Sequence, residues 1–256
     1  HRPRATDYIA EQIKITQELI QAGYAYKVRG SVYFRTEKFE SYGTLSKNQL
    51  AGLIAGNRIK INTEKESPLD FALWKQAETN HLMQWNSPWG KGFPGWHIEC
   101  SAMSRALLGN HFDIHTGGED NIFPHHECER AQNEVSNHGK KSVNYWLHSK
   151  HLLVDGAKMS KSKGNFYTVR DIFSKDYSPE SLRYLLLSAH YRTALNFTFS
   201  GLEMAQRSVD RIEEALRIFT ELAGEEDTKI EWIELARTQY QEALADDLNV
   251  PEALAA

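Results

Sequence analysis

The feature that most constrains the fold is a change of periodicity across residues 111–134. His111–His115 alternates polar and apolar residues, as a half-buried strand does. A Gly-rich turn is expected at Thr116–Asp120, and Pro124 stands where a helix should begin. Strand, turn and helix in this order form half of a parallel βαβ unit, which is the phosphate-binding geometry of doubly wound sheets. The sequence therefore predicts an α/β fold with a nucleotide-binding layer.

A basic loop is expected at Lys158–Phe166. Three lysines and two serines fall within its first six residues, just before a glycine. The apolar segment Leu152–Val154 enters it through an Asp155–Gly156 turn, and a capping pair, Thr168 with Asp171, follows it. A loop held between ordered elements can bring ammonium groups onto a triphosphate. Composition alone equally fits a solvated surface loop.

Composition excludes several classes of protein. The chain has 256 residues, 41% of them hydrophobic and 25% charged, which is typical of one or two globular domains. A net charge of −4 gives no general support for nucleic-acid binding, so any RNA contact must come from local patches. No segment approaches the about 18 apolar residues of a membrane span. Two cysteines in different settings favour a reducing, cytoplasmic compartment.

The remaining elements are predicted from apolar spacing and turn residues. Before residue 110 we expect, in order, a helix at 6–22 capped by Thr6 or Asp7 and ended by Gly23, a hairpin of 24–28 and 31–34 around Arg29–Gly30, a short helix at 48–55, a strand at 70–75, an ordered loop at 78–95 and a helix at 95–108. After residue 170 we expect a helix capped by Ser178, a helix with a Ser200–Glu203 capping box and an apolar stripe to Phe219, a charged turn at 224–229 and a helix at 231–245.

Three side chains form a candidate metal site. His125 and Glu129 are four residues apart and so share one helical face, and Cys100 could add a thiolate from a separate element. This combination is a weak signal, because most lone cysteines are buried hydrophobes and most His–Glu pairs are surface partners. Three ligands leave the fourth position open, as a catalytic or substrate-binding zinc does.

Two groups of motifs resemble a known family. Lys158-Met159-Ser160-Lys161-Ser162 is identical to the KMSKS signature of class I aminoacyl-tRNA synthetases. Gly95–Met103, Asp113–Asp120 and Phe123–Glu129 are similar to blocks of the cysteinyl-tRNA synthetase family. The resemblance implies an α/β fold: part of a class I synthetase nucleotide-binding (Rossmann-like) fold with an inserted connective region, followed by an α-helical domain.

The resemblance also implies three regions: a connective region at 1–90, the second half of the catalytic domain at 91–175, and a helical region at 176–256. The family's first ATP motif and its upstream zinc cysteine are absent from this sequence, and the chain does not begin with Met. We therefore expect a fragment of a longer enzyme, which by itself should not aminoacylate at a useful rate.

Site residues follow from the same resemblance. Zinc would be held by Cys100, His125 and Glu129, with Cys128 a bystander. Trp96 would wall the amino-acid pocket and His115 would lie beside the substrate, although both also suit core packing. The resemblance further implies that the nucleotide and its phosphates are bound by Gly117, Gly118, Asp120, Lys158 and Lys161. Asp120 would orient the amino acid as well as the adenosine, and Lys158 and Lys161 would be catalytic by stabilising the charge that develops on the phosphates.

The implied enzyme is a cysteine–tRNA ligase. It would activate L-cysteine with ATP and Mg²⁺, then transfer it to the 3′ end of tRNA(Cys), and one Zn²⁺ would select the thiol against serine. It would be a cytoplasmic monomer with no membrane partner. Two alternatives remain open: a ligase joining cysteine to an amino sugar in mycothiol synthesis, and a non-catalytic zinc- or tRNA-binding module derived from a synthetase.

Overall fold

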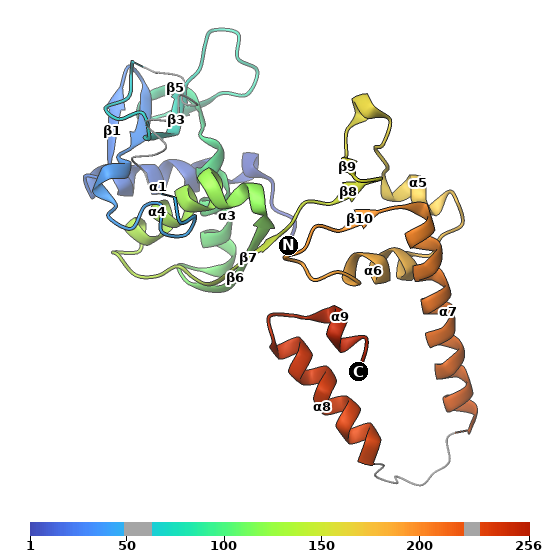
Figure 1. The fold of residues 1–256 in the computed structure, drawn as a ribbon. Coiled ribbons are helices and arrows are strands. Elements are labelled where there is room, and N and C mark those ends of the chain that lie inside the picture. The colour runs from blue at the N-terminus through green and yellow to red at the C-terminus, as the bar shows by residue number, and fades with distance from the viewer. Residues whose placement is uncertain (49–62, 223–230) are drawn as a thin grey trace. The chain divides into compact units, whose positions relative to one another are not determined.

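The computed structural model describes residues 1–48, 63–222 and 231–256, and it divides into two compact units, His1–His148 and Ser149–Ala256 (Figure 1). The predicted helix at 48–55 falls almost wholly outside the described residues, and the charged turn at 224–229 falls entirely outside them. No described helix combines the length and the apolar character that crossing a membrane requires. The three functional regions expected from the sequence stay a prediction.

The first unit contains an antiparallel five-stranded sheet in the order β1-β2-β3-β5-β4. Its strands are β1 (Ala25–Val28), β2 (Ser31–Phe34), β3 (Phe71–Gln76), β4 (Trp85–Ser87) and β5 (Gly90–Pro94). The predicted first hairpin is confirmed. Arg29 and Gly30 both have positive φ, 47° and 86°, which is the two-residue turn that matches strand twist.

The prediction of a loop at 78–95 holds for residues 78–84 and is wrong for residues 85–94, because β4 and β5 form a second hairpin there. Glycines and a proline hid the strand signal. Gly92 is required where it lies: a Cβ at this position would be 2.2 Å from Nε1 of Trp74. The strand can therefore cross the Trp74 indole only as glycine, and packing rather than propensity decides the structure here.

Helices pack under this sheet in the same unit (Figure 1). They are α1 (Ile9–Gln21), α3 (Trp96–Leu108) and α4 (Glu127–Ser136), with short 3₁₀ turns η1 (Ala5–Tyr8) and η2 (Thr36–Lys38). The predicted cap at Thr6 or Asp7 is wrong, because both lie inside η1 and α1 begins at Ile9 without a side-chain cap. The end at Gly23, with φ 78°, is confirmed. Fully buried Leu19, Phe34, Trp74 and Ile98 join helices and sheet in one core.

The strand–helix block is present with shifted boundaries. It comprises β6 (Phe112–Gly118), η3 (Glu119–Asn121), the wide turn η4 (Ile122–His126), α4 and β7 (Val143–Ser149), and β6 neighbours β7 in a two-stranded sheet. The predicted turn at Thr116–Asp120 is wrong for its first three residues, which extend β6. The predicted helix start at Pro124 is also wrong, because extended Phe123 interrupts the helical backbone and α4 begins at Glu127.

The second unit begins with a small sheet in the order β10-β8-β9. It contains β8 (Leu153–Val154), β9 (Ala157–Lys158), η5 (Lys161–Lys163), α5 (Val169–Phe173), α6 (Pro179–Leu187) and β10 (Asn196–Phe197). The predicted turn at Asp155–Gly156 and the caps at Thr168 and Ser178 are confirmed. Val154, Ile172 and Leu202 lie in its core.

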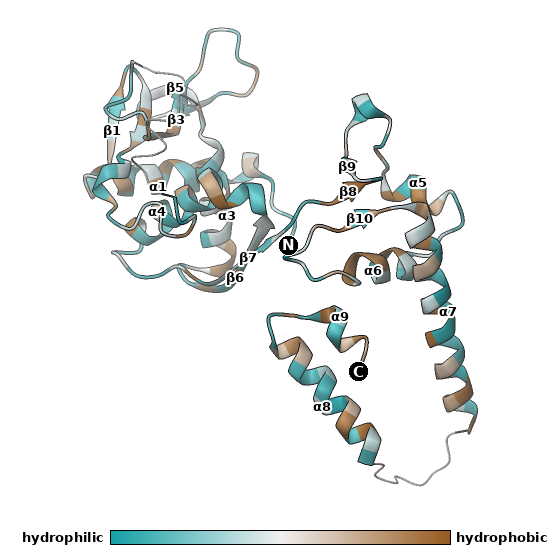
Figure 2. Cartoon of the chain, viewed as in Figure 1, coloured by the Kyte–Doolittle hydropathy of each residue, from teal (hydrophilic) through white to brown (hydrophobic). Residues whose placement is uncertain are grey.

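Three further helices complete this unit: α7 (Phe199–Leu222), α8 (Glu231–Ala245) and α9 (Val250–Ala253). The predicted Ser200–Glu203 capping box is wrong, since α7 starts earlier and the Thr198 hydroxyl accepts a hydrogen bond from the Gly201 amide at 3.0 Å. The apolar stripe is buried as far as Val209, whereas Leu216 and Phe219 are exposed. Figure 2, which is coloured by hydropathy, shows the apolar residues that recur along α7.

Candidate metal and nucleotide site

The structure brings Cys100, His125 and Glu129 together. Cys100 lies on α3, His125 lies near the end of the wide turn before α4, and Glu129 lies in the first turn of α4. One ligand atom from each lies within 4.8 Å of the other two. The helical geometry that places residues i and i+4 on one face puts Nε2 of His125 at 2.7 Å from Oε1 of Glu129.

Glu129 has the environment of a metal ligand. Its side chain is 0% exposed, and among the described residues neither oxygen receives a hydrogen bond. Two imidazoles approach these oxygens, but their contacts lack hydrogen-bond geometry: His125 Nε2 at 2.7 Å and His115 Nε2 at 3.3 Å. A buried carboxylate without donors is costly unless a cation compensates it. Sulfur, nitrogen and oxygen donors together suit zinc.

The Cys100 thiol is held protonated in the absence of a cation. Burial raises its pKa to about 12, and the negative charges of Glu129 and Glu99 act in the same direction. A bound divalent cation reverses this balance, since metal–thiolate bonding requires the proton to leave. The three side chains therefore fit a metal ion that would supply the missing positive charge.

A cluster of histidines surrounds these residues, and no role was predicted from the sequence for three of them, His97, His126 and His148. Nδ1 of His97 lies 2.8 Å from Nδ1 of His125, and Nδ1 of His126 lies 2.8 Å from Nε2 of His148. Burial lowers the pKa of His97 to about 4 and that of His126 to about 3, so both rings are neutral near pH 7. The adjacent His125–His126 pair was the one sequence signal that could have indicated the cluster.

Trp96 and His115 lie beside the metal residues. The Trp96 ring is 4.2 Å from that of His125, and 61% of this tryptophan is exposed. That exposure argues against a purely core-packing role. The His115 ring lies between two other rings of the site: it is tilted against that of Trp146, with the centroids 4.7 Å apart, and meets that of His126 edge to face at 4.6 Å. The substrate contacts expected of both residues stay predictions.

The two glycines at the end of β6 are needed by the chain itself. A Cβ on Gly117 would lie 2.6 Å from the His126 ring, and one on Gly118 would lie 2.5 Å from Oδ1 of Asp120. Their small size thus lets Asp120 and His126 fold back against β6. Their role in nucleotide approach, with that of Asp120, stays a prediction.

In the second unit, Lys158 ends β9 and Lys161 begins η5, and both are exposed. Asn165 holds this loop closed. Its Oδ1 accepts from the Ser160 amide at 2.9 Å, while its Nδ2 donates to the carbonyls of Val154 at 3.3 Å and Lys158 at 3.2 Å. No role was predicted for Asn165 from the sequence. The loop thereby presents its ammonium groups on an ordered frame.

Comparisons with known proteins identify the family of the chain. Residues 1–207 match the family described as the tRNA synthetases class I (C) catalytic domain. Curated relatives include the cysteine–tRNA ligases of Thermus thermophilus (46% identical, 99% of this chain and 53% of the relative), Brachyspira hyodysenteriae (47%, 98% and 55%) and Vibrio atlanticus (48%, 98% and 53%). The chain thus spans about half the length of these relatives.

Two solved structures share the fold. One is a putative arginyl-tRNA synthetase from Campylobacter jejuni, with a TM-score of 0.56 and 14% identity over 98% of this chain and 52% of the other. The second is a leucyl-tRNA synthetase of Agrobacterium radiobacter in a ternary complex with tRNA, with a TM-score of 0.50 and 17% identity over 68% of this chain and 28% of the other. Together with the family match, they confirm the predicted fold class.

Proposed function

The chain belongs to the family of class I (C) tRNA synthetases, and from this membership we propose that it is the part of a cysteine–tRNA ligase that holds the amino-acid site and the KMSKS loop. The proposed substrates are L-cysteine, ATP with Mg²⁺, and tRNA(Cys). The proposal places the protein in the cytoplasm, as a monomer.

The observation that carries the proposal is the meeting of Cys100, His125 and the donor-free carboxylate of Glu129. When bound there, zinc would ligate a substrate thiol and lower its pKa, which a serine hydroxyl of nearly equal size cannot reproduce. Discrimination then comes from ligand chemistry rather than size, so no editing site is needed.

The surrounding side chains have separate tasks in this proposal. Trp96 walls the amino-acid pocket, and His115 lies beside the substrate, with its Nε2 3.3 Å from Oε2 of Glu129. Asp120 would orient the amino acid and the adenosine. Buried Cys128 stays a bystander, supported by its Sγ lying 3.2 Å from the Tyr42 hydroxyl inside the core.

The reaction would proceed in two steps. A cysteine carboxylate oxygen attacks the α-phosphorus of ATP, the bond to the β-phosphate oxygen breaks, and pyrophosphate leaves. Lys158 and Lys161 stabilise the charge on the phosphates, which is an electrostatic role without proton transfer. A terminal ribose hydroxyl of the tRNA then attacks the carbonyl carbon of the adenylate, and AMP leaves.

Cysteine-dependent exchange of pyrophosphate into ATP, measured on the full-length protein, tests the proposal. We expect exchange with cysteine and none with serine. Absence of exchange, or equal exchange with serine, would contradict the zinc-based selection. Transfer of cysteine to an amino sugar instead of tRNA would show the mycothiol-type ligase.

A further inference from the structure

A second basic feature lies in the first unit, away from the KMSKS loop in the sequence. It is a pocket of about 380 Å³ between the sheet and the start of α3. Lysines and aromatic rings dominate its lining, which includes Tyr33, Lys65, Phe71, Lys75, Trp96 and His97. We call it the lysine pocket. Nothing in the proposed activation step uses its lysines.

The two lysines bring two positive charges to one pocket. Lys65 is half-buried in the segment before β3, and Lys75 is exposed near the end of β3. Within the described part of the chain neither ammonium forms an ion pair or a hydrogen bond. The pKa of Lys65 is lowered by burial and also by the positive charge of Lys75, while Asp70 acts in the opposite direction. An anion between them would relieve the repulsion.

Asp70 cannot serve as that anion by side-chain contact, because its oxygens are already used. They accept hydrogen bonds from Tyr26, from the amide and hydroxyl of Thr36, and from the Ser67 amide. The lysine pocket therefore keeps its positive charge for an outside ligand.

The lysine pocket shares a wall with the metal residues. Trp96 and His97 line it, and both also contact His125, through a ring separation of 4.2 Å and an Nδ1–Nδ1 distance of 2.8 Å. A ligand in the pocket would thus have one end beside the amino acid. The exposed face of Trp96 offers a stacking surface for a base.

We propose that the lysine pocket binds a backbone phosphate of the single-stranded 3′ end of the RNA substrate, an inference that rests on the proposed function. Ammonium groups beside an aromatic plate are the chemistry that recognises single-stranded RNA. The acceptor ribose must reach the activated carboxyl group, so its phosphate must bind close to the amino-acid site. The phosphates of ATP have their own lysines at 158 and 161.

The test uses Lys65→Gln, Lys75→Gln and the double variant of the full-length protein. Lys27→Gln, an exposed lysine on β1, is the matched control. Each pocket substitution should raise the KM for tRNA roughly tenfold, because a charge-assisted phosphate contact is lost. The KM values for ATP and cysteine in exchange should stay at the wild-type level, and the control should leave all three constants unchanged.

Two further measurements locate the contact. The slope of log K for RNA against log salt should become shallower by about 0.7 for each lost phosphate contact. RNA lacking its last two 3′ nucleotides should bind the wild-type and double-variant proteins equally. If the double substitution weakens binding of the shortened RNA as much as binding of the whole RNA, the lysines contact another part of the RNA and the inference is wrong.

The outcomes separate this inference from the proposed function. If the double variant has an unchanged KM for tRNA and intact exchange, the inference about the lysine pocket is wrong while the proposed function stands. If the KM for ATP rises instead, the pocket binds the nucleotide and the inference is again wrong. Absence of cysteine-dependent exchange in the wild-type protein overturns the proposed function.

Discussion

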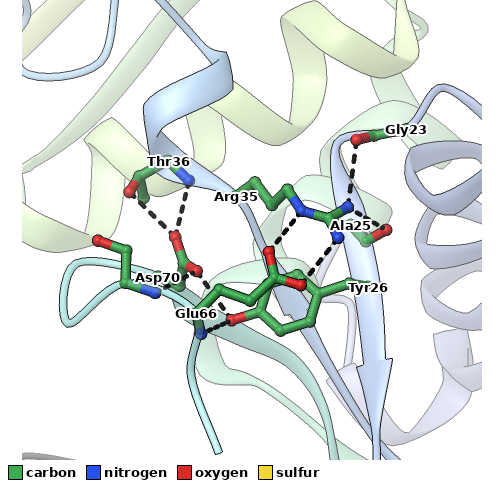
Figure 3. A network of polar contacts seen from close by, with 8 residues as sticks. Gly23, Ala25, Tyr26, Arg35, Thr36, Glu66 and Asp70 are labelled. Atoms are coloured by element: carbon green, nitrogen blue, oxygen red, sulfur yellow. Dashed lines mark hydrogen bonds and ion pairs between the residues drawn. The ribbon is translucent and has the colours of Figure 1, made fainter.

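Replacing Asp70 by alanine should destabilise the first unit by about 3–5 kcal/mol. Asp70 is 2% exposed, and it accepts four hydrogen bonds (Figure 3). Its Oδ1 binds the Thr36 amide at 3.0 Å and the Thr36 hydroxyl at 3.2 Å. Its Oδ2 binds the Tyr26 hydroxyl at 2.8 Å and the Ser67 amide at 3.1 Å.

The magnitude follows from the groups left behind. Alanine would leave two backbone N–H groups, those of Thr36 and Ser67, without an acceptor. Each unsatisfied buried donor costs about 1–3 kcal/mol. The two hydroxyls can rotate, and that of Tyr26 also accepts from the Glu66 amide at 2.7 Å, so their loss adds less. The total lies in the upper range for single substitutions, which is expected when a buried network is broken.

Urea denaturation followed by tryptophan fluorescence measures this change. Five of the six tryptophans lie in the first unit, at 74, 85, 89, 96 and 146, so the signal reports mainly on that unit. The matched control is Glu66→Gln, which breaks the ion pair with Arg35 at the exposed edge of the same network and should cost less than about 1 kcal/mol. A loss below about 1 kcal/mol for Asp70→Ala would refute the reasoning that the buried amides depend on this carboxylate.

Two other predictions concern single residues. Cys100→Ser should lower the zinc content of the purified protein, measured by metal analysis, and raise the KM for cysteine, measured by exchange kinetics. The control variant Cys128→Ser should keep its zinc. An unchanged zinc content in Cys100→Ser would show that Cys100 is not a ligand. Hydrogen bonds from Arg192 and Tyr191 lower the pKa of Asp247 to about 2. Because this folded-state pKa lies below the ordinary value of about 3.9, the stabilisation is present above about pH 4 and is lost as the pH falls toward about 2. NMR titration should show the low pKa and its return toward the ordinary value in Arg192→Gln; an unshifted wild-type carboxyl would contradict the contact.

Local signals in the sequence were sufficient where one or two residues decide the backbone. Arg29–Gly30 and Asp155–Gly156 each supply two positive φ angles, so both turns could be placed from the sequence. Helix periodicity likewise put His125 and Glu129 on one face, and the structure shows their contact. These features depend on neighbours within four residues, which the sequence displays directly.

Features that depend on distant partners could not be predicted. The strand at Gly90–Pro94 exists because Gly92 fits against Trp74, and no local pattern reports that contact. The starts of α1 and α4 differ from the predicted positions because another turn, η1 or η4, directly precedes each helix. The start of α7 differs because Thr198, rather than Ser200, accepts a hydrogen bond from an amide of the first turn. The lysine pocket depends on packing of the segment before β3, so Lys65 carried no signal in the sequence.

The Asn165 side chain described above has a mechanical consequence. The side-chain amide of Asn165 links the backbone amide of Ser160 to the carbonyls of Val154 and Lys158, so hydrogen bonds close the KMSKS loop into a ring. These contacts link the backbone on both sides of Met159, so the backbone positions from Lys158 to Lys161 depend on Asn165. Replacing Asn165 would therefore remove the contacts that order this backbone, although both lysines would still be present.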